Sequence, residues 1–541
     1  MSRFGVVLAL VTLAFGAGSA SAWAGTWTRD EAQELRLYDA ALVVARPGAG
    51  PALRQAGGVK IASTLPVWRV PSRSALRVFP GLVRDGLIGD LSADQPLSTF
   101  VEPEYNEWWI PVVRADQAVA PGPGKPVTVI DTGVDIAHPE FANRPSTTLL
   151  NPQSTSAQFE EHGTAVASVA AAPVNGFGLI GIYPQAALQI WDASPFGDGL
   201  TVGDVVEGLD AAIRRGPGVV NLSLGSPFRN SVLEAMIAVT VGSGTLVVAA
   251  AGNSRDRGSP LEYPASFPHV LTIGALDTTG APALFSSGSK HVDLAAPGVD
   301  IPVAVPTTYH PPIFYEEDGF SGTSFSSPLV SGAAAWVWTA RPTLDVGQLF
   351  EVMRASAQDV SSPGYDIFSG FGRLDVPTAL TVAPPARDPQ EPNEDVTYIK
   401  PHGLLGRARA PLTGAGKRSG SVNARLDVGE DPRDVYRIWI PGRRAASIAL
   451  QPSGGDVDLA AWGPRTNSVL ETGSARKRDA RGLSERGGTK RERLRVKNPA
   501  RKGAYFYVEA SVAAGARLAA RKVAALKYDL AVSIVKPAAQ R

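Results

Sequence analysis

Cysteine is absent from this sequence of 541 residues, and histidine occurs only six times. The lack of cysteine excludes disulfides, zinc sites with cysteine ligands and thiol nucleophiles. Charge is nearly balanced as well, with 52 Lys and Arg residues against 51 Asp and Glu residues. Because 44% of the residues are hydrophobic and only 19% are charged, the chain is apolar enough to fold, and its length predicts two or three globular domains.

Long apolar runs are missing beyond the N-terminus. Even the stretch Gly332–Ala340 ends at Arg341, well short of the ~18 residues that a membrane span needs, so we expect no membrane span. Residues Met1–Ala22 are different, because Arg3 precedes an apolar stretch that ends in the small residues Ala20–Ala22. That layout is typical of a secretory signal peptide. We therefore expect a secreted protein, extracellular or, in a cell with an outer membrane, periplasmic.

Shifts in pattern divide the rest of the chain into segments. Residues 23–104 mix short apolar runs with a short helix, Ser74–Phe79, which we expect Pro80 to stop, and they indicate a small α+β unit. Residues 383–397 are rich in proline and polar residues and predict a linker. Residues 398–541 contain alternating runs, such as Asp434–Ile440 and Ala504–Glu509, which predict a β-sandwich.

Residues 105–382 follow another pattern, in which apolar runs alternate with amphipathic ones. The runs expected to be strands are Val127–Asp131, Leu188–Ala193, Val219–Leu224 and Thr245–Ala251, and helices are expected at Val202–Arg215 and Val232–Val241. This alternation predicts an α/β fold, a parallel sheet with helices on both faces.

One stretch is strongly basic. Residues Ser474–Lys502 hold twelve Lys and Arg against three Asp and Glu, a composition that could bind nucleic acid or an anionic surface. No aromatic residue lies between Arg476 and Lys502, however. We interpret the stretch as a solvated loop between strands and expect no nucleic-acid partner.

Three short motifs carry residues suited to nucleophilic catalysis. Asp131 ends a predicted parallel strand, where active sites of open α/β sheets gather. His162 opens a helix of small residues, and Ser324 follows the turn Gly322–Thr323 at the start of another helix. Each residue alone also has an ordinary interpretation: Asp131 could cap a turn, His162 could lie on the surface, and Ser324 could cap its helix.

In the order Asp-Thr-Gly (131–133), His-Gly-Thr (162–164) and Gly-Thr-Ser (322–324), the motifs resemble the signatures of the subtilisin-like serine proteases, the subtilases. The resemblance covers residues 126 to about 379. It implies that Ser324 is the nucleophile, His162 the general base and Asp131 the carboxylate that orients the imidazole. Asn253, which follows an apolar strand, matches the amide of the oxyanion hole. An α/β-hydrolase would need glycine at position 326 and a different order of these residues.

The resemblance also implies how substrate and ions bind. The residues Ser223, Leu224 and Gly225 resemble the strand that pairs with an extended peptide, and Ala250, Ala251 and Gly252 would line the opposite wall of the principal pocket. These residues are small and no charged residue is evident among them, so we expect an apolar or broad preference. The chemistry requires no cofactor. Subtilases often hold structural calcium, and Glu140 and Asn175 match one such site.

The flanking segments resemble known accessories of subtilases. Residues 23–104 correspond to a propeptide that assists folding and blocks the cleft, and we expect self-cleavage between about Ser98 and Tyr105. The motifs Glu391–Glu394, Asp431–Tyr436 and Gly455–Leu459 resemble the pre-peptidase C-terminal β-sandwich of secreted bacterial proteases.

The sequence therefore favours a secreted serine endopeptidase that acts on proteins or peptides through an acyl-enzyme intermediate and is made as an autoprocessed zymogen. Two alternatives remain open. The first is a catalytically silent binding protein on a subtilase scaffold, although such a protein would not need all four residues of the predicted site. The second is an enzyme that processes one dedicated partner.

Overall fold

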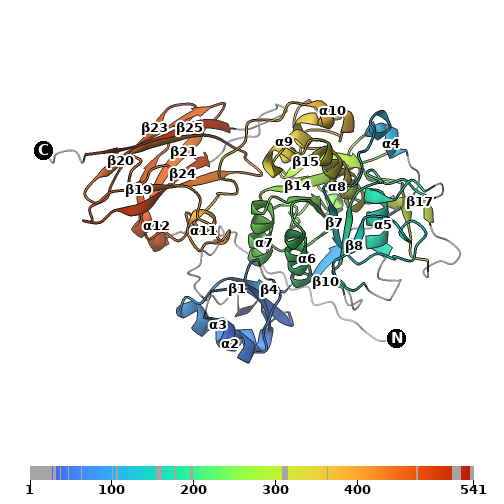
Figure 1. Cartoon of the computed structure of the whole chain (residues 1–541), viewed down its shortest axis with the longest axis horizontal. Coiled ribbons are helices and arrows are strands. Elements are labelled where there is room, and N and C mark those ends of the chain that lie inside the picture. The colour runs from blue at the N-terminus through green and yellow to red at the C-terminus, as the bar shows by residue number, and fades with distance from the viewer. Residues whose placement is uncertain are drawn as a thin grey trace.

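The computed structural model describes residues 27, 32–33, 35–36, 38–46, 48–62, 64–94, 96–99, 102–104, 108–153, 161–175, 178–194, 199–307, 315–361, 363–470, 473–513 and 526–536. The expected signal peptide, Met1–Ala22, lies outside these residues. Figure 1 shows a central α/β domain, a small N-terminal unit in blue beneath it, and a C-terminal β domain in orange and red on the left.

A parallel sheet forms the middle of the central domain. Its seven strands follow the order β15-β14-β13-β11-β7-β9-β8, and every neighbouring pair is parallel. The strands are β7 (Val127–Asp131), β8 (Thr147–Leu149), β9 (Leu188–Asp192), β11 (Val219–Leu222), β13 (Leu246–Ala250), β14 (Val270–Leu276) and β15 (Val292–Pro297). The strands expected from the apolar runs are confirmed, each to within two residues at either end.

Helices cover both faces of this sheet, as the α/β pattern predicted. The helices α5 (Glu161–Ala171) and α8 (Thr323–Ala340) share one apolar core with Val129 of β7, whereas α6 (Val202–Arg215) and α7 (Ser231–Gly242) share another with the next residue, Ile130. Alternate side chains of a strand point to opposite faces, which explains why one continuous apolar run serves two cores. Gly332 lets α8 approach α5 closely, since a Cβ there would lie 2.9 Å from the backbone oxygen of Ala170.

The N-terminal unit is α+β, with one difference from expectation. Its sheet has the order β2-β3-β1-β4, and its helices are α2 (Gly50–Gln55) and α3 (Ser72–Arg84). The strands are β1 (Ala40–Ala45), β2 (Val59–Lys60), β3 (Val67–Pro71) and β4 (Ile88–Ala93). The expectation that Pro80 stops the helix was wrong, because α3 continues to Arg84. Burial of Phe79, Leu82 and Val83 on both sides of Pro80 offsets the lost backbone hydrogen bond.

The C-terminal domain is a sandwich of two antiparallel sheets with an apolar core between them. One sheet contains β18 (Ser419–Leu426), β25 (Leu526–Val535), β20 (Ala445–Ser453) and β23 (Glu492–Lys497). The other contains β19 (Arg433–Ile440), β24 (Ala504–Val512), β21 (Val457–Trp462) and β22 (Ala480–Ser484).

The basic stretch Ser474–Lys502 is not the loop that we expected. It forms most of α12 (Gly473–Asp479) and all of β22 and β23. In β23, Glu492 and Val496 are buried while Arg493, Arg495 and Lys497 are exposed. The basic residues therefore occupy the solvent face of an edge strand, a position where charge prevents pairing with other chains.

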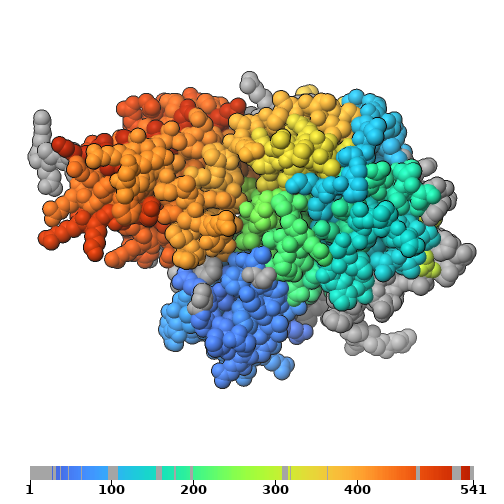
Figure 2. Space-filling view, in the orientation of Figure 1, coloured from blue at the N-terminus to red at the C-terminus, as the bar shows by residue number. Residues whose placement is uncertain are grey.

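The domains are in contact. In Figure 2 the N-terminal unit (blue) packs against the central domain, and the orange domain adjoins the green and yellow helices. Within the described part of the chain, no helix has the length and apolar character needed to cross a membrane.

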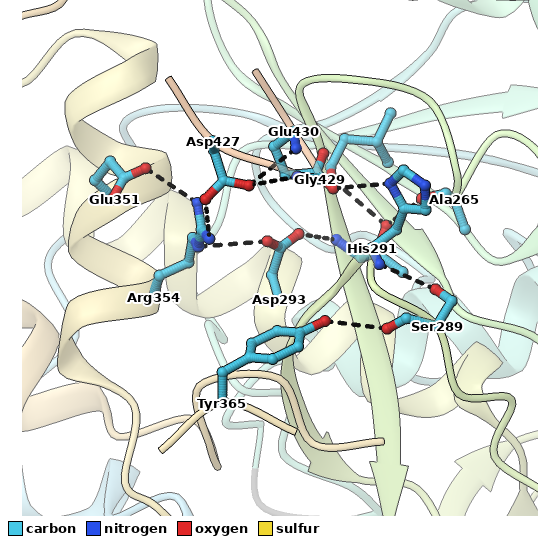
Figure 3. A network of polar contacts seen from close by, with 12 residues as sticks. Ala265, Ser289, His291, Asp293, Glu351, Arg354, Tyr365, Asp427, Gly429 and Glu430 are labelled. Atoms are coloured by element: carbon cyan, nitrogen blue, oxygen red, sulfur yellow. Dashed lines mark hydrogen bonds and ion pairs between the residues drawn. The ribbon is translucent and has the colours of Figure 1, made fainter. Parts of the chain in front are cut away.

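A buried ionic network joins the central and C-terminal domains (Figure 3). Arg354, on helix α9 (Val346–Ser356), is 3% exposed and forms ion pairs with Asp293 of β15, Glu351 of α9 and Asp427 of the C-terminal domain at 3.4, 3.1 and 2.9 Å. Because Asp427 is one of three carboxylates around a buried guanidinium, the C-terminal domain contributes directly to the charge balance of the central domain.

Candidate active site

Asp131 and His162 form a buried hydrogen-bonded pair. Asp131 ends β7, His162 is the second residue of α5, and the imidazole Nδ1 lies 2.7 Å from the carboxylate Oδ1. The backbone N–H of Thr132 donates to the same oxygen at 2.8 Å. Glycine is needed at position 163, because a Cβ there would lie 2.0 Å from the backbone oxygen of Gly133. The two motifs therefore pack directly on each other and fix the carboxylate against the ring.

The other imidazole nitrogen faces no donor or acceptor of the described residues. His162 Nε2 is buried and has no hydrogen-bond partner among the described residues. If Nδ1 carries the proton that it donates to Asp131, Nε2 is the unprotonated nitrogen of a neutral ring and can accept a proton. The ring contacts Phe325, with centroids 6.0 Å apart. Since Phe325 directly follows Ser324, the imidazole lies beside the N-terminus of α8. The structure thus brings Asp131, His162 and Ser324 to one edge of the sheet.

Ser324 differs from the serines around it. Its hydroxyl makes a long hydrogen bond of 3.5 Å to the backbone oxygen of Ser223. The hydroxyls of Ser326 and Ser327 instead donate to Ala296 O at 3.0 Å and Asn221 Oδ1 at 2.8 Å, and Ser321 Oγ accepts from a backbone N–H at 3.0 Å. These serines have structural roles, whereas the hydrogen bond of Ser324 to Ser223 is long.

Asn253 is held with its amide N–H₂ group free. Its Oδ1 accepts from both the backbone N–H and the hydroxyl of Thr323 at 3.0 Å. Its Nδ2 is buried and has no partner in the described part of the chain. Because Thr323 directly precedes Ser324, the Asn253 side chain is held at the N-terminus of α8, where Ser324 lies. A buried amide donor of fixed orientation is suited to stabilise an oxyanion.

The predicted peptide-binding strand is paired with the chain itself. Strand β5 (Pro96–Thr99) lies between β10 (Leu200–Thr201) and β12 (Leu224–Gly225) in a three-stranded antiparallel sheet. Ser98 pairs with Gly225, and Thr99 pairs with Leu224. A short distance further along the chain, β6 (Glu102–Glu104) pairs with β17 (Tyr315–Ser321), where Glu102 is opposite Ser321. Strands β5 and β6 thus pair with two segments that lie near Ser324 in the sequence or in space: β17 ends three residues before it, and Ser223, whose backbone oxygen accepts from the Ser324 hydroxyl, precedes β12.

A charged residue missed by the sequence analysis lies beside two of the residues predicted to line the principal pocket. The side chain of Glu262 packs on Gly252, where an added Cβ would meet its Cγ at 2.8 Å. The next residue, Tyr263, exchanges backbone hydrogen bonds with Ser226, which follows the wall residue Gly225. Glu262 is 5% exposed, and its Oε2 has no partner among the described residues. Burial raises its pKa to about 7.

The expectation of an uncharged pocket therefore rested on an incomplete set of residues. Glu262 reaches Gly252 through the backbone pairing of Tyr263 with Ser226, which joins two loops and for which the sequence carries no periodic signal. Its position ten residues after Gly252 in an irregular stretch gave no indication of contact.

The residues expected to bind calcium lie together but are already engaged. Glu140 Oε1 accepts from the backbone N–H of Leu179 at 2.7 Å, and Oε2 accepts from the side-chain amide of Asn175 at 3.0 Å. Both carboxylate oxygens therefore hold N–H donors, an arrangement that does not suit a cation ligand. Calcium at Glu140 and Asn175 stays a prediction without support from this geometry.

Known proteins of similar sequence cover the central domain. A model described as the subtilase family matches residues 122–372. The chain is 31% identical to subtilisin DY of Bacillus licheniformis over 278 residues, which are 50% of this chain and 97% of that protein. It is 34% identical to subtilisin Savinase of Lederbergia lenta over 245 residues, 44% of this chain and 86% of that protein.

A solved structure resembles the wider architecture. Fervidolysin from Fervidobacterium pennivorans, described as a keratinolytic enzyme related to subtilisin, matches with a TM-score of 0.55 over 84% of each chain. Because the sequences are only 18% identical, this likeness concerns the fold alone.

Proposed function

Because this chain belongs to the subtilase family of proteases, we propose that it is a secreted serine endopeptidase with Ser324 as its nucleophile. The observation that carries the proposal is the 2.7 Å bond between His162 Nδ1 and Asp131, which leaves Nε2 free beside the N-terminus of α8. A silent scaffold would have no physical reason to keep a buried imidazole nitrogen and the buried amide of Asn253 both unpaired at one site.

In the proposed mechanism, His162 Nε2 takes the proton of Ser324 Oγ as the oxygen attacks the carbonyl carbon of the scissile bond. Asp131 keeps the imidazole in the right tautomer and stabilises the imidazolium that forms. Asn253 Nδ2 donates to the oxyanion of the tetrahedral intermediate. The imidazolium then protonates the leaving amine, which gives an acyl-enzyme. Water, deprotonated by His162, hydrolyses this ester and regenerates Ser324.

We further propose that the N-terminal unit is an inhibitory propeptide. Its strand β5 pairs with β10 and β12 as an extended substrate would, and β6 pairs with β17, which ends three residues before Ser324. The bond cut during maturation therefore lies within residues 99–102, inside the window expected from the sequence. Residues 100 and 101 lie outside the described residues.

A fluorophosphonate probe tests the catalytic role. We expect the matured protein to be labelled, labelling to be lost in Ser324→Ala, and labelling to persist in Ser321→Ala, which changes a neighbouring structural serine. A matured protein that resists the probe would instead support the silent binding protein.

A further inference from the structure

Positive and negative charges are divided unevenly along the chain. Residues 398–541, which include the whole β-sandwich, hold 29 Lys and Arg against 12 Asp and Glu, whereas residues 1–397 hold 23 against 39. The near-neutral total therefore conceals a C-terminal domain of net charge +17 beside a remainder of net charge −16. Such an asymmetry between two parts of a chain indicates that the basic part meets an anionic partner.

Seven positive charges of this domain gather at one end of the sandwich. We call this surface the basic end, and it consists of exposed residues of strand β23 and of two turns: Arg493, Arg495, Lys497, Arg443–Arg444 and Arg501–Lys502. Lys497 pairs with Ala445, the first residue of β20. The backbone N–H of Asn498 donates to Arg444 O at 2.9 Å, which joins the turn after β23 to the turn before β20. The seven charges therefore form one continuous surface.

The basic end is not neutralised by the chain around it. None of its seven side chains forms an ion pair with the described residues, whereas Arg478 of the same domain pairs with Asp479 at 2.5 Å. Arg495 donates instead to the backbone oxygen of Lys536. In the described strands of this sheet, Asp529 is the only outward-facing carboxylate, and it lies on β25, two strands from β23. Protection of an edge explains charge on β23, but it does not explain charge on the turns.

Next to β23, the outer face of the sheet is flat and carries short side chains. Ser447 of β20 lies opposite Arg495, and Ser533 of β25 lies opposite Ser447. The neighbouring row, which begins at Arg493, has alanine in both strands. Alternate residues of a strand are roughly 7 Å apart, so Arg493, Arg495 and Lys497 form a straight row of charges beside a floor of small residues.

The character of this face selects among anionic partners. Single-stranded nucleic acid stacks its bases on aromatic side chains, and the described outward-facing positions of the four strands hold none. Membranes are bound through apolar side chains that insert among the lipids, and duplex DNA through an element that enters a groove. A flat floor of serine and alanine supplies neither. An anionic polysaccharide needs cations for its acidic groups and hydroxyls for its sugar rings, and the row of cations beside Ser447 and Ser533 supplies both.

We propose that the basic end binds an anionic polysaccharide with carboxylate or sulfate groups, and that the C-terminal domain thereby holds the protein on such a polymer. Strand β19 begins shortly after Asp427, which contacts Arg354 of the central domain, and its eight residues span roughly 25 Å before the turn at Arg443. A polymer at the basic end is therefore remote from this contact with the central domain. The proposal does not depend on the protease activity, because no residue of the basic end belongs to the candidate active site.

The test uses the full-length protein carrying Ser324→Ala, so that self-digestion cannot interfere. The probes are dextran sulfate and polygalacturonate, with neutral dextran as the control, and calorimetry measures binding at several salt concentrations. We expect an anionic probe to bind and dextran not to bind. The logarithm of the binding constant should fall linearly with the logarithm of the salt concentration, because the polymer releases counterions when the cations bind it. A preference for one of the two anionic probes would support the proposal and identify the acidic group.

Two triple variants with the same change in net charge locate the surface. The first carries Arg493→Gln, Arg495→Gln and Lys497→Gln, and the second carries Arg407→Gln, Arg465→Gln and Lys477→Gln at exposed positions elsewhere in the domain. We expect the first variant to bind about tenfold or more weakly at low salt and with a smaller salt dependence. The second should stay within about threefold of the parent. Thermal unfolding should be the same in all three proteins, because the six positions are exposed.

Several outcomes would overturn the proposal. Equal weakening in the two triple variants would assign binding to net charge rather than to the basic end. Failure of both anionic polysaccharides to bind the folded parent would contradict it directly. Tighter binding of a short DNA, single-stranded or duplex, or of phosphatidylglycerol vesicles would assign the surface to another class of partner. If the first triple variant does not fold, Arg443→Gln with Arg444→Gln, in a turn outside the sheet, replaces it, and unchanged binding in that variant would also contradict the proposal.

Discussion

Thr323 holds Asn253 by two hydrogen bonds of 3.0 Å to the same side-chain oxygen, while the amide N–H₂ group is buried without a partner among the described residues. If this amide stabilises the oxyanion, Asn253→Ala should lower kcat by about 10²–10³-fold with little change in KM, the magnitude known for the corresponding donor of subtilisin. Steady-state kinetics on a chromogenic peptide measure this. Asn423→Ala, on the C-terminal sandwich, should leave kcat unchanged. A parallel rise in KM with kcat preserved would show that Asn253 only binds substrate.

Self-cleavage should depend on Ser324 and fall within residues 99–102. Mass spectrometry of the purified protein should show a mature N-terminus at residue 100, 101 or 102. The Ser324→Ala variant should keep the N-terminal unit covalently attached, because no nucleophile is present. Ser321→Ala serves as the matched control and should mature normally. An identical N-terminus in the active protein and in Ser324→Ala would mean that another protease makes the cut.

Glu262 should give the pocket a pH-dependent preference. Because burial raises its pKa to about 7, the carboxyl is neutral below that pH and charged above it. The ratio of kcat/KM for a substrate with Lys before the scissile bond to one with Leu should therefore rise about tenfold or more between pH 6 and pH 8. In Glu262→Gln the ratio should not change with pH. A pH-independent ratio in the unsubstituted enzyme would place Glu262 out of reach of the substrate.

Asp94 should strengthen inhibition by the N-terminal unit. It accepts from the backbone N–H of Gly203 at 2.7 Å, near the N-terminus of α6, and pairs with Arg69 at 2.7 Å. Asp94→Asn removes the charge that this helix end favours, an effect of about 1 kcal/mol. The isolated unit, added in trans, should then inhibit the mature enzyme about five- to tenfold more weakly. Asp85→Asn, at an exposed position of the same unit, should not alter the inhibition constant.

The Arg354 network should make the C-terminal domain necessary for stability. Asp427→Ala leaves a buried guanidinium with one carboxylate fewer, which costs about 3–5 kcal/mol. Urea denaturation in the Ser324→Ala background measures this loss. Disrupting the exposed pair of Arg84 and Asp85 by Arg84→Met should change stability by less than about 1 kcal/mol. A small effect of Asp427→Ala would show that the two domains are energetically independent.

The central fold and the contact between the motifs of Asp131 and His162 could be predicted because they depend on local patterns. Apolar runs such as Val127–Asp131 contribute side chains to two cores at once. Glycine at position 163 is itself a sign of close packing, because no larger residue fits against the backbone of Gly133. Features that depend on pairing between distant segments could not be predicted from the sequence. The contact of Glu262 with Gly252 arises from loops without periodicity, and the basic face of β23 was misinterpreted because its charge concealed the alternation of buried Glu492 and Val496.

The surroundings of the linker could not be predicted from the sequence either. Its motif Glu391–Glu394 was interpreted only as a mark of the domain that follows, because the sequence gives no sign that Asp431, Asp434 and His269 converge on it. The prediction for the end of helix α3 was wrong for another reason. Pro80 does remove a backbone hydrogen bond, but burial of the apolar residues around it outweighs this loss and the helix continues.

The pairing of β5 and β6 within one molecule has a kinetic consequence for the proposed self-cleavage. Both strands, which flank the proposed cut, pair with β12 and β17 of the same molecule, so that the reaction would need no second molecule. Maturation would then be a first-order event whose half-time does not change when the protein is diluted, and a cell could time it by synthesis alone.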